Sequence, residues 1–356
     1  MADARFASVY PLHTARAPIP SRLLTLAFAY SDMTSTRLTS KLTGLCDDDT
    51  GRCVRLAAAF AAVYLIWGST YLAIRVAIET IPPFVMAGSR FLVAGALLFL
   101  WSMARGKARP TRAQWISALI VGGLLLAGGN GAVTWSEQEV PSGLAALVVA
   151  TIPIWMVLLD ALRPGGSRPN RYTMLGVIIG FLGIALLFGP ANLREIHGIR
   201  PISMIVLFCA PLSWAIGSLY SRGAPKPHAP LQGIGMQMLC GGALLLIAAT
   251  VTGQWAEVEV SSISAASVVS FLYLVVFGSI IAYSAYIWLL SATTPAKVST
   301  YAYVNPVIAV FLGWAVASEP VTPAMLGAMV IILFSVTLIS GVADRRKTVT
   351  ASRRDG

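Results

Sequence analysis

Residues 65–75 read LIWGSTYLAIR, and residues 212–222 read LSWAIGSLYSR. Each segment is mostly apolar and places an Arg eight positions after a Trp. One step of 147 positions relates the two segments, and it matches Trp67 with Trp214 and Arg75 with Arg222. If this step continues along the chain, it marks an internal repeat.

The repeat extends well beyond the two quoted segments. The step of 147 also matches Pro83 with Pro230, Gly88 with Gly235, and residues 95–98 with 242–245, both GALL. Later matches drift by a few residues, as short insertions would cause: Asn130 with Ser284, Pro141 with Pro295, Pro153 with Pro306, and 174–176 with 325–327. So many matches in the same order predict two homologous halves.

The composition indicates a membrane protein. Of the 356 residues 56% are apolar and 12% are charged, and the mean hydropathy is +0.74. A soluble domain usually carries about 25% charged residues. The net charge of +11 could suggest nucleic acid binding, but the Lys and Arg residues fall in gaps between apolar runs. That distribution indicates membrane topology and argues against a nucleic acid partner.

Ten stretches are long and apolar enough to be membrane-spanning helices, which need about 20 such residues. They are 56–75, 83–103, 114–136, 140–161, 172–189, 201–221, 230–252, 264–291, 296–317 and 322–342. Residues 1–55 are expected to form a disordered cytoplasmic tail without a cleaved signal peptide, with Met33 as an alternative start to Met1. A basic cytoplasmic tail is expected over 343–356.

Basic residues predict the orientation. With a cytoplasmic N-terminus, ten spans place all but four of the 26 Lys and Arg residues on the cytoplasmic side, and the C-terminus is also cytoplasmic. The four exceptions are Arg75, Arg90, Arg194 and Arg200.

Five spans per repeat is an odd number, so the halves 56–189 and 201–342 should have opposite orientations. We therefore expect an all-α integral membrane protein of ten transmembrane helices in two inverted repeats, with a substrate site near the midplane between them. Arg75 and Arg222 then lie at the ends of corresponding helices. A helix-end anchor is favoured over a gating role for each.

Several segments resemble the EamA group of the drug/metabolite transporter superfamily, and most of all its YedA-like exporters. They are IWGSTYLAIR, PPFVMAGSRFLVAG, GNGAVTWSEQEVPSGLAALVVATIP, FGSIIAYSAYIWL and STYAYVNPVIAVFLG, the last followed by Glu319 in a loop. The resemblance implies residence in the inner membrane and export of small metabolites or toxic compounds. The N-terminal tail has no counterpart in the family pattern. The loop ALRPGGSRPN after the fourth span lacks an acid to match Glu319.

Polar residues inside the spans are the first candidates for substrate contact. Arg90 lies about seven residues into the second span, where a charge costs roughly 2.5 kcal/mol or more. Contact with substrate or a gate and an ion pair with Glu137 are both open interpretations. Asn130, Thr134 and Glu137 follow at i, i+4 and i+7, which places them on one stripe of the third span. Glu137 is either a hydrated carboxylate at the loop edge, or a proton-responsive group or partner for a cationic substrate.

Aromatic side chains with polar tips complete the predicted pocket, although helix packing and the interfacial belt are the alternative roles for each. The candidate substrate-binding residues are Trp67, Tyr71, Arg90, Asn130, Glu137, Tyr283, Ser284, Tyr286, Tyr301 and Asn305. Pro153 and Pro306 occupy matching positions in the two halves, and a mid-helix proline kinks a helix. Gly176, Gly180 and Gly183 indicate a close packing face on the fifth span, within the chain or in a homodimer.

Enzyme, cofactor and metal signatures are not found in the sequence. There is no GxxxxGK[ST] loop, the three histidines are scattered, and the four cysteines lie in the tail or in spans. We therefore expect a secondary transporter that exports small metabolites, amino acids or amphipathic drugs by alternating access. Its expected partners are a small-molecule substrate, the lipid bilayer and, as an open option, a second copy. The alternative is a non-transporting membrane protein, either a lipid-modifying enzyme or a sensor.

Overall fold

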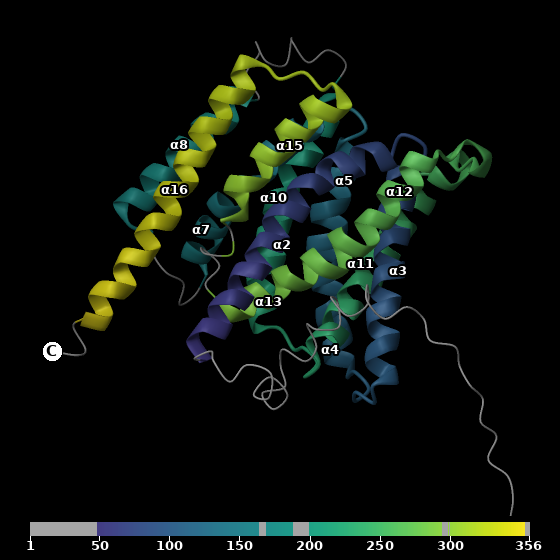
Figure 1. Cartoon of the computed structure of the whole chain (residues 1–356), viewed down its shortest axis with the longest axis horizontal. Coiled ribbons are helices and arrows are strands. Elements are labelled where there is room, and N and C mark those ends of the chain that lie inside the picture. The colour runs from purple at the N-terminus through teal and green to yellow at the C-terminus, as the bar shows by residue number, and fades with distance from the viewer. Residues whose placement is uncertain (1–47, 164–168, 188–198, 294–297, 299, 353–356) are drawn as a thin grey trace, which may run out of the picture. The chain divides into compact units, whose positions relative to one another are not determined.

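The computed structural model describes residues 48–163, 169–187, 199–293, 298 and 300–352 (Figure 1). Throughout these ranges the regular elements are helices. In the first half they are α2 (Asp48–Ala77), α3 (Pro83–Ala104), α4 (Arg112–Val121), η2 (Gly122–Gly131), α5 (Ala132–Ser136), α6 (Ser142–Val149), α7 (Ile152–Leu162) and α8 (Arg171–Leu187). In the second half they are α10 (Pro201–Gly223), α11 (Pro230–Val251), η3 (Gln254–Glu257), η4 (Val260–Ser262), α12 (Ala265–Tyr273), η5 (Leu274–Tyr283), α13 (Ser284–Ala292), α15 (Tyr301–Ala317) and α16 (Pro323–Ser352).

Seven helices in the described ranges are long and apolar enough to cross a membrane: Gly51–Ala77, Pro83–Ala104, Arg112–Ser136, Ser142–Leu162, Pro201–Gly223, Pro230–Val251 and Ala265–Ala292. Three shorter apolar helices, Arg171–Gly183, Val304–Ala317 and Pro323–Ser335, lie where the fifth, ninth and tenth spans are expected. The chain is thus a helical protein with several membrane spans.

Local sequence fixes many of the helix starts and ends. Proline occupies the first turn of α3, α10 and α11, where its missing N–H is not needed. Thr111 and Gln114 form a capping box at the start of α4. The first helix begins at Asp48, inside the tail expected over 1–55, and acidic residues at a helix N-terminus favour such a start. The rest of that tail lies outside the described residues. At the other end, α16 runs to Ser352, ten residues past the expected end of the last span.

Helices α3 and α11 pack backbone against backbone at two pairs of glycines. A Cβ on Gly95 would lie 2.8 Å from the carbonyl oxygen of Gly235, and a Cβ on Gly242 would lie 2.9 Å from that of Gly88. Small residues allow such contact between membrane helices, where packing replaces the hydrophobic effect as the driving force.

A second close pair is formed by α8 and α16, which lie side by side in Figure 1. Ser335 donates a 2.7 Å hydrogen bond to the Gly176 carbonyl, and Cβ atoms on Gly180 and Gly183 would collide with side chains of α7 and α16. The glycine face predicted on the fifth span therefore packs within the chain, which leaves the homodimer untested.

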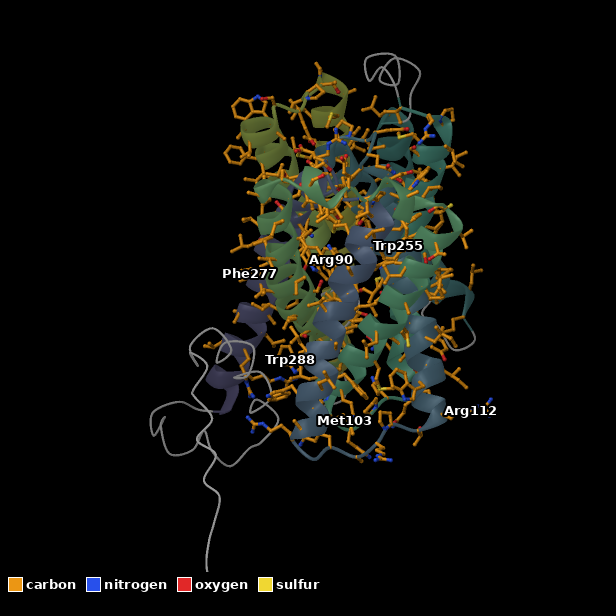
Figure 2. All side chains as sticks on the ribbon, turned by 90° about the vertical axis from the view of Figure 1, so that its right-hand side faces the viewer. Arg90, Met103, Arg112, Trp255, Phe277 and Trp288 are labelled. Atoms are coloured by element: carbon orange, nitrogen blue, oxygen red, sulfur yellow. The ribbon has the colours of Figure 1, made fainter. Side chains whose placement is uncertain are left out.

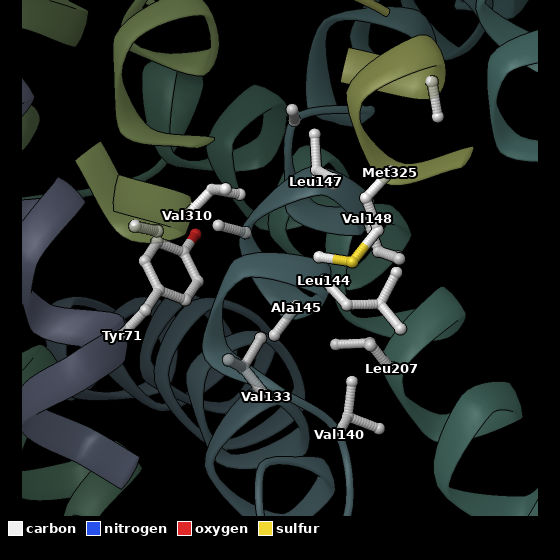
Figure 3. Packing of buried hydrophobic residues seen from close by; sticks show 14 of the residues in the cluster. Tyr71, Val133, Val140, Leu144, Ala145, Leu147, Val148, Leu207, Val310 and Met325 are labelled. Carbon is white, nitrogen blue, oxygen red and sulfur yellow. The ribbon is translucent and has the colours of Figure 1, made fainter. Parts of the chain in front are cut away.

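The buried core centres on α6, every residue of which from Ser142 to Val148 is buried. Figure 3 shows Leu144 and Val148 beside Met325, with Tyr71 next to Val310. Contacts from both halves of the sequence hold this short helix in place.

Three spans depart from the continuous α-helices that the sequence predicts. Segments η2 and η5 are π-helices of ten residues each, at corresponding places in the third and eighth spans. The fourth span divides between Val149 and Ile152, so Pro153 lies in the first turn of a separate helix, α7. Pro306 lies inside α15. π-Helical turns are rare and occur frequently at functional sites.

Because the Gly95 face touches backbone, we expect Gly95→Ala to destabilise the protein by about 1–3 kcal/mol through overpacking. The measurement is the melting temperature of the purified protein in detergent. Gly51→Ala is the control, since a Cβ there meets nothing within 4 Å. Equal melting temperatures for the two variants would contradict the backbone contact.

Candidate functional site

A cavity opens between helices of the two halves. The empty space within it, including the solvent at its opening, is about 670 Å³. The lining comes from α2, α3, η2, α5, α6, α7, α10, η5 and α15. Both π-helical segments and both sides of the break in the fourth span therefore contribute to its wall.

Arg90 is the charged residue of this cavity. Its side chain is 3% exposed, and Figure 2 shows it deep in the bundle, far along α3 from Met103. One terminal nitrogen donates a 2.6 Å hydrogen bond to the Asn130 side-chain oxygen, which also accepts from the Thr134 hydroxyl at 3.4 Å. In the described part of the chain the ion pairs join Arg163 to Asp160 and Arg200 to Glu139. The ion pair between Arg90 and Glu137, one of two interpretations, is thus not formed.

The second half contains a neutral counterpart of this bridge. Gln237 is the repeat position of Arg90, and its side-chain oxygen accepts a 2.9 Å hydrogen bond from the Tyr283 hydroxyl. Each bridge links the second helix of its half to the π-helical segment of the third. One bridge carries a positive charge and the other carries none.

Four aromatic rings form a cluster beside the cavity. Trp67 lies 5.5 Å from Trp214, 5.0 Å from Tyr286 and 5.4 Å from Tyr301 between ring centroids. The Trp67 indole donates to the Gly278 carbonyl at 3.2 Å, and the Trp214 indole donates to the Tyr286 hydroxyl at 2.9 Å. The two tryptophans that first indicated the repeat therefore touch each other across the two halves.

Six of the ten predicted binding residues line the cavity: Trp67, Tyr71, Arg90, Asn130, Tyr283 and Tyr301. The other four are buried but do not line it: Glu137, Ser284, Tyr286 and Asn305. The Tyr286 ring packs against the rings of Trp67 and Trp214. The Asn305 amide, oriented to satisfy its bonds, donates to the backbone oxygens of Tyr301 and Tyr64.

The prediction missed Trp214, Thr70 and Pro211, together with the apolar and glycine wall formed by Ile74, Phe91, Leu126, Gly129, Val133, Val149, Ile152, Ala210 and Gly278. A signal existed for Trp214, because it is the repeat mate of the predicted Trp67. The apolar wall resembles any other span residue and gives no such signal.

Glu137 is fully buried where α5 ends, and neither carboxylate oxygen has a hydrogen-bond partner in the part of the chain that the structure describes. Tyr71, Arg75, Arg90 and Glu319 lie within electrostatic range of it. Arg75 donates to the backbone oxygens of Glu137 and Gln138. Arg75 thus binds protein, which differs from the lipid-facing anchor expected for it, whereas its repeat mate Arg222 is exposed.

Residues 137–143 comprise the connection after α5 and the first two residues of α6, and they are bound to distant parts of the chain. Glu319 accepts hydrogen bonds from the Ser142 backbone (2.9 Å) and hydroxyl (2.8 Å), and from the Gly143 backbone (3.3 Å). Its carboxylate fits because Gly313 has no Cβ, which would collide with it. Glu319 thereby caps the N-terminus of α6, where a negative charge is stabilising.

Glu139 makes the tie to α10. It pairs with Arg200 and accepts a 2.7 Å hydrogen bond from the Ser203 hydroxyl. Desolvation raises the pKa of the Glu139 carboxyl, but hydrogen bonds from the Arg200 backbone, Ser203 and the Arg200 guanidinium outweigh it and hold this pKa below its usual value. The tie therefore persists into mildly acidic solution.

A bundle of long apolar helices around a cavity lined by aromatic rings and a buried arginine is typical of a multi-pass membrane protein. The chain matches the EamA-like transporter family over residues 55–189 and again over 201–341, and it belongs to that family.

Two relatives are similar over most of their length. An Escherichia coli K12 protein, "Uncharacterized inner membrane transporter YedA", is 39% identical over 80% of this chain and 90% of its own. "Uncharacterized transporter YoaV" of Bacillus subtilis is 26% identical over 78% of this chain and 94% of its own. Family and relatives are transporters, which agrees with the expectation that the protein is not an enzyme.

One solved crystal structure has the same fold, with a TM-score of 0.59 at 19% identity. It covers 82% of this chain and 99% of its own.

Glu319→Ala should weaken the start of α6 by about 1–2 kcal/mol, since three hydrogen bonds and a helix-cap charge are lost. We expect faster hydrogen exchange at the amides of Ser142 and Gly143. Exposed Glu79, changed to Ala, is the control. Unchanged exchange in Glu319→Ala would show that the cap does not stabilise α6.

Proposed function

We propose that this protein is a secondary transporter that exports small solutes by alternating access and holds them in the Arg90 cavity. The observation that carries the proposal is a buried guanidinium in the cavity wall, with no ion-pair partner among the described residues, in a chain of a transporter family. Intramembrane charges of this kind are costly, and they mark substrate pathways.

An inverted pair of five-helix repeats would supply the two moving parts. The repeat places Gly88 on Gly235 and Gly95 on Gly242. Exchanging the halves therefore turns the Gly88–Gly242 contact into the Gly235–Gly95 contact. The paired polar bridges, the paired π-helices and the double match to the family add support. Ten spans with both termini in the cytoplasm remain the topology that best fits the basic residues.

The cavity suits small metabolites, amino acids and amphipathic drugs, because it combines aromatic rings with an arginine and an amide. By analogy with the inner membrane relative, the inner membrane of a bacterium is the proposed location. A cytoplasmic location of both terminal segments and a homodimer are further predictions.

Expression in an export-deficient bacterium should raise resistance to a subset of toxic amino acids, analogues and drugs. Arg90→Ala should remove that resistance, because the cavity loses its charge. Growth is measured across the panel at matched protein levels, with exposed Arg222→Ala as the control. Resistance to no compound, or equal resistance with Arg90→Ala, would contradict efflux through this cavity.

Proton exchange is the proposed driving force, with Glu137 as the carrier. A buried carboxylate without hydrogen bonds favours its neutral, protonated form, and Arg75 and Arg90 oppose this while Glu319 reinforces it. Efflux should therefore vary with external pH in the native protein and lose that variation in Glu137→Gln. Transport in vesicles at a series of pH values measures this, with Glu79→Gln as the control. An unchanged pH profile would exclude Glu137 as the carrier and favour facilitated efflux.

A further inference from the structure

The hydrogen-bond donors of the cavity wall divide into two sets. The indole of Trp67 donates to Gly278, that of Trp214 to Tyr286, and the Tyr283 hydroxyl donates to Gln237. These donors are already used by the protein. They add shape and apolar surface to the cavity rather than free polar groups.

Two buried polar groups of the wall are left over. Among the described residues, the Nε atom of Arg90 has no hydrogen-bond partner, and neither has the hydroxyl of Tyr301, because the Trp214 indole donates to Tyr286 instead. Both side chains are 3% exposed and both line the cavity. Leaving a buried donor without a hydrogen-bond acceptor is unfavourable, and more so when the donor is charged. Arg90 Nε can only donate, so a ligand that satisfies it must supply an acceptor.

The charge of the wall restricts that acceptor further. Among the described residues that line the cavity, Arg90 is the one with a charge. Glu137 is buried outside the lining, so no acidic side chain of the described wall is available to bind a cationic ligand. A singly charged anion would balance Arg90, whereas the second charge of a phosphate dianion would be left uncompensated in an apolar surrounding.

The rest of the wall selects the body of the ligand. Trp67, Phe91 and Trp214 supply aromatic surface, and Ile74, Leu126 and Ile152 supply aliphatic surface. Planar or aliphatic groups gain most from burial against such surfaces.

We infer that the cavity selects monocarboxylates with an aromatic or aliphatic body, with the carboxylate bound by Arg90 Nε and the Tyr301 hydroxyl. Asn130 positions the guanidinium by accepting from its terminal nitrogen. This inference rests on the proposed transport function and specifies its substrate class.

The test measures binding to the purified full-length chain by titration calorimetry at neutral pH. Three carboxylates of increasing size, namely benzoate, phenylacetate and 2-naphthoate, are each compared with the amide of the same acid. Phenethylamine is the cationic match for phenylacetate. We expect at least one carboxylate to bind roughly tenfold or more tightly than its amide, a difference of about 1.4 kcal/mol, and more tightly than the amine.

Variants connect that preference to the residues. Arg90→Gln should reduce the carboxylate-to-amide ratio to about one, and Arg90→Lys should retain part of it because the charge remains. Tyr301→Phe should weaken the carboxylate severalfold, consistent with one lost hydrogen bond. Arg222→Gln, which changes an exposed arginine outside the cavity wall, should leave the ratio unchanged.

Three outcomes would overturn the inference: no carboxylate binds better than its amide, phenethylamine binds best, or Arg90→Gln retains the full preference. The native protein alone decides the first two, so they do not depend on the folding of any variant. If resistance in the growth panel still requires Arg90 while these carboxylates show no preference, the substrate class is wrong and the proposed transport function stands. If the carboxylates bind but no compound is exported, the transport function fails and the binding preference stands.

Discussion

The Arg90 guanidinium is a positive charge held inside a bundle of apolar helices by one hydrogen bond to Asn130. Without an ion-pair partner, such a charge is tolerated only where neighbouring groups or a ligand can solvate it. The arrangement around it meets that need. The π-helical segment η2 carries Asn130, the fourth span is divided, and the aromatic cluster closes one side. Each of these features borders the same cavity.

The second half of the chain repeats the architecture without repeating the charge. Gln237 and Tyr283 reproduce the bridge in neutral form, and η5 reproduces the π-helical segment. The glycine contacts pack α3, which carries Arg90, directly against α11, which carries Gln237. The two halves therefore differ in charge at corresponding positions, Arg90 and Gln237. Glu319 and Arg75, one from each half of the chain, hold residues 137–143 by hydrogen bonds.

Much of this could be predicted from sequence because membrane helices follow simple rules. Long apolar runs predicted the seven helices that are long enough to cross a membrane. A charge or an amide inside a span predicted that Arg90 and Asn130 line a cavity, since polar groups in hydrocarbon are costly. The repeat relation between Trp67 and Trp214 could have predicted that Trp214 also lines the cavity. Other features depend on three-dimensional contacts. The π-helices have no shared composition, as η2 is half glycine and η5 contains one. Whether Glu137 reached Arg90 depended on side-chain geometry, and the cap made by Glu319 joins residues 177 positions apart.

Alternating access of the Arg90 cavity is the central claim, and thiol accessibility tests it most directly. Val149 lines the cavity and is half-buried, so Val149→Cys in a chain whose four native cysteines are replaced by Ser reports on the cavity alone. A membrane-impermeant thiol reagent is applied to right-side-out and to inside-out vesicles. Labelling from both sides, slowed from both by an exported solute, is the result expected of a cavity that opens alternately. Labelling from one side alone, or from neither, would contradict it.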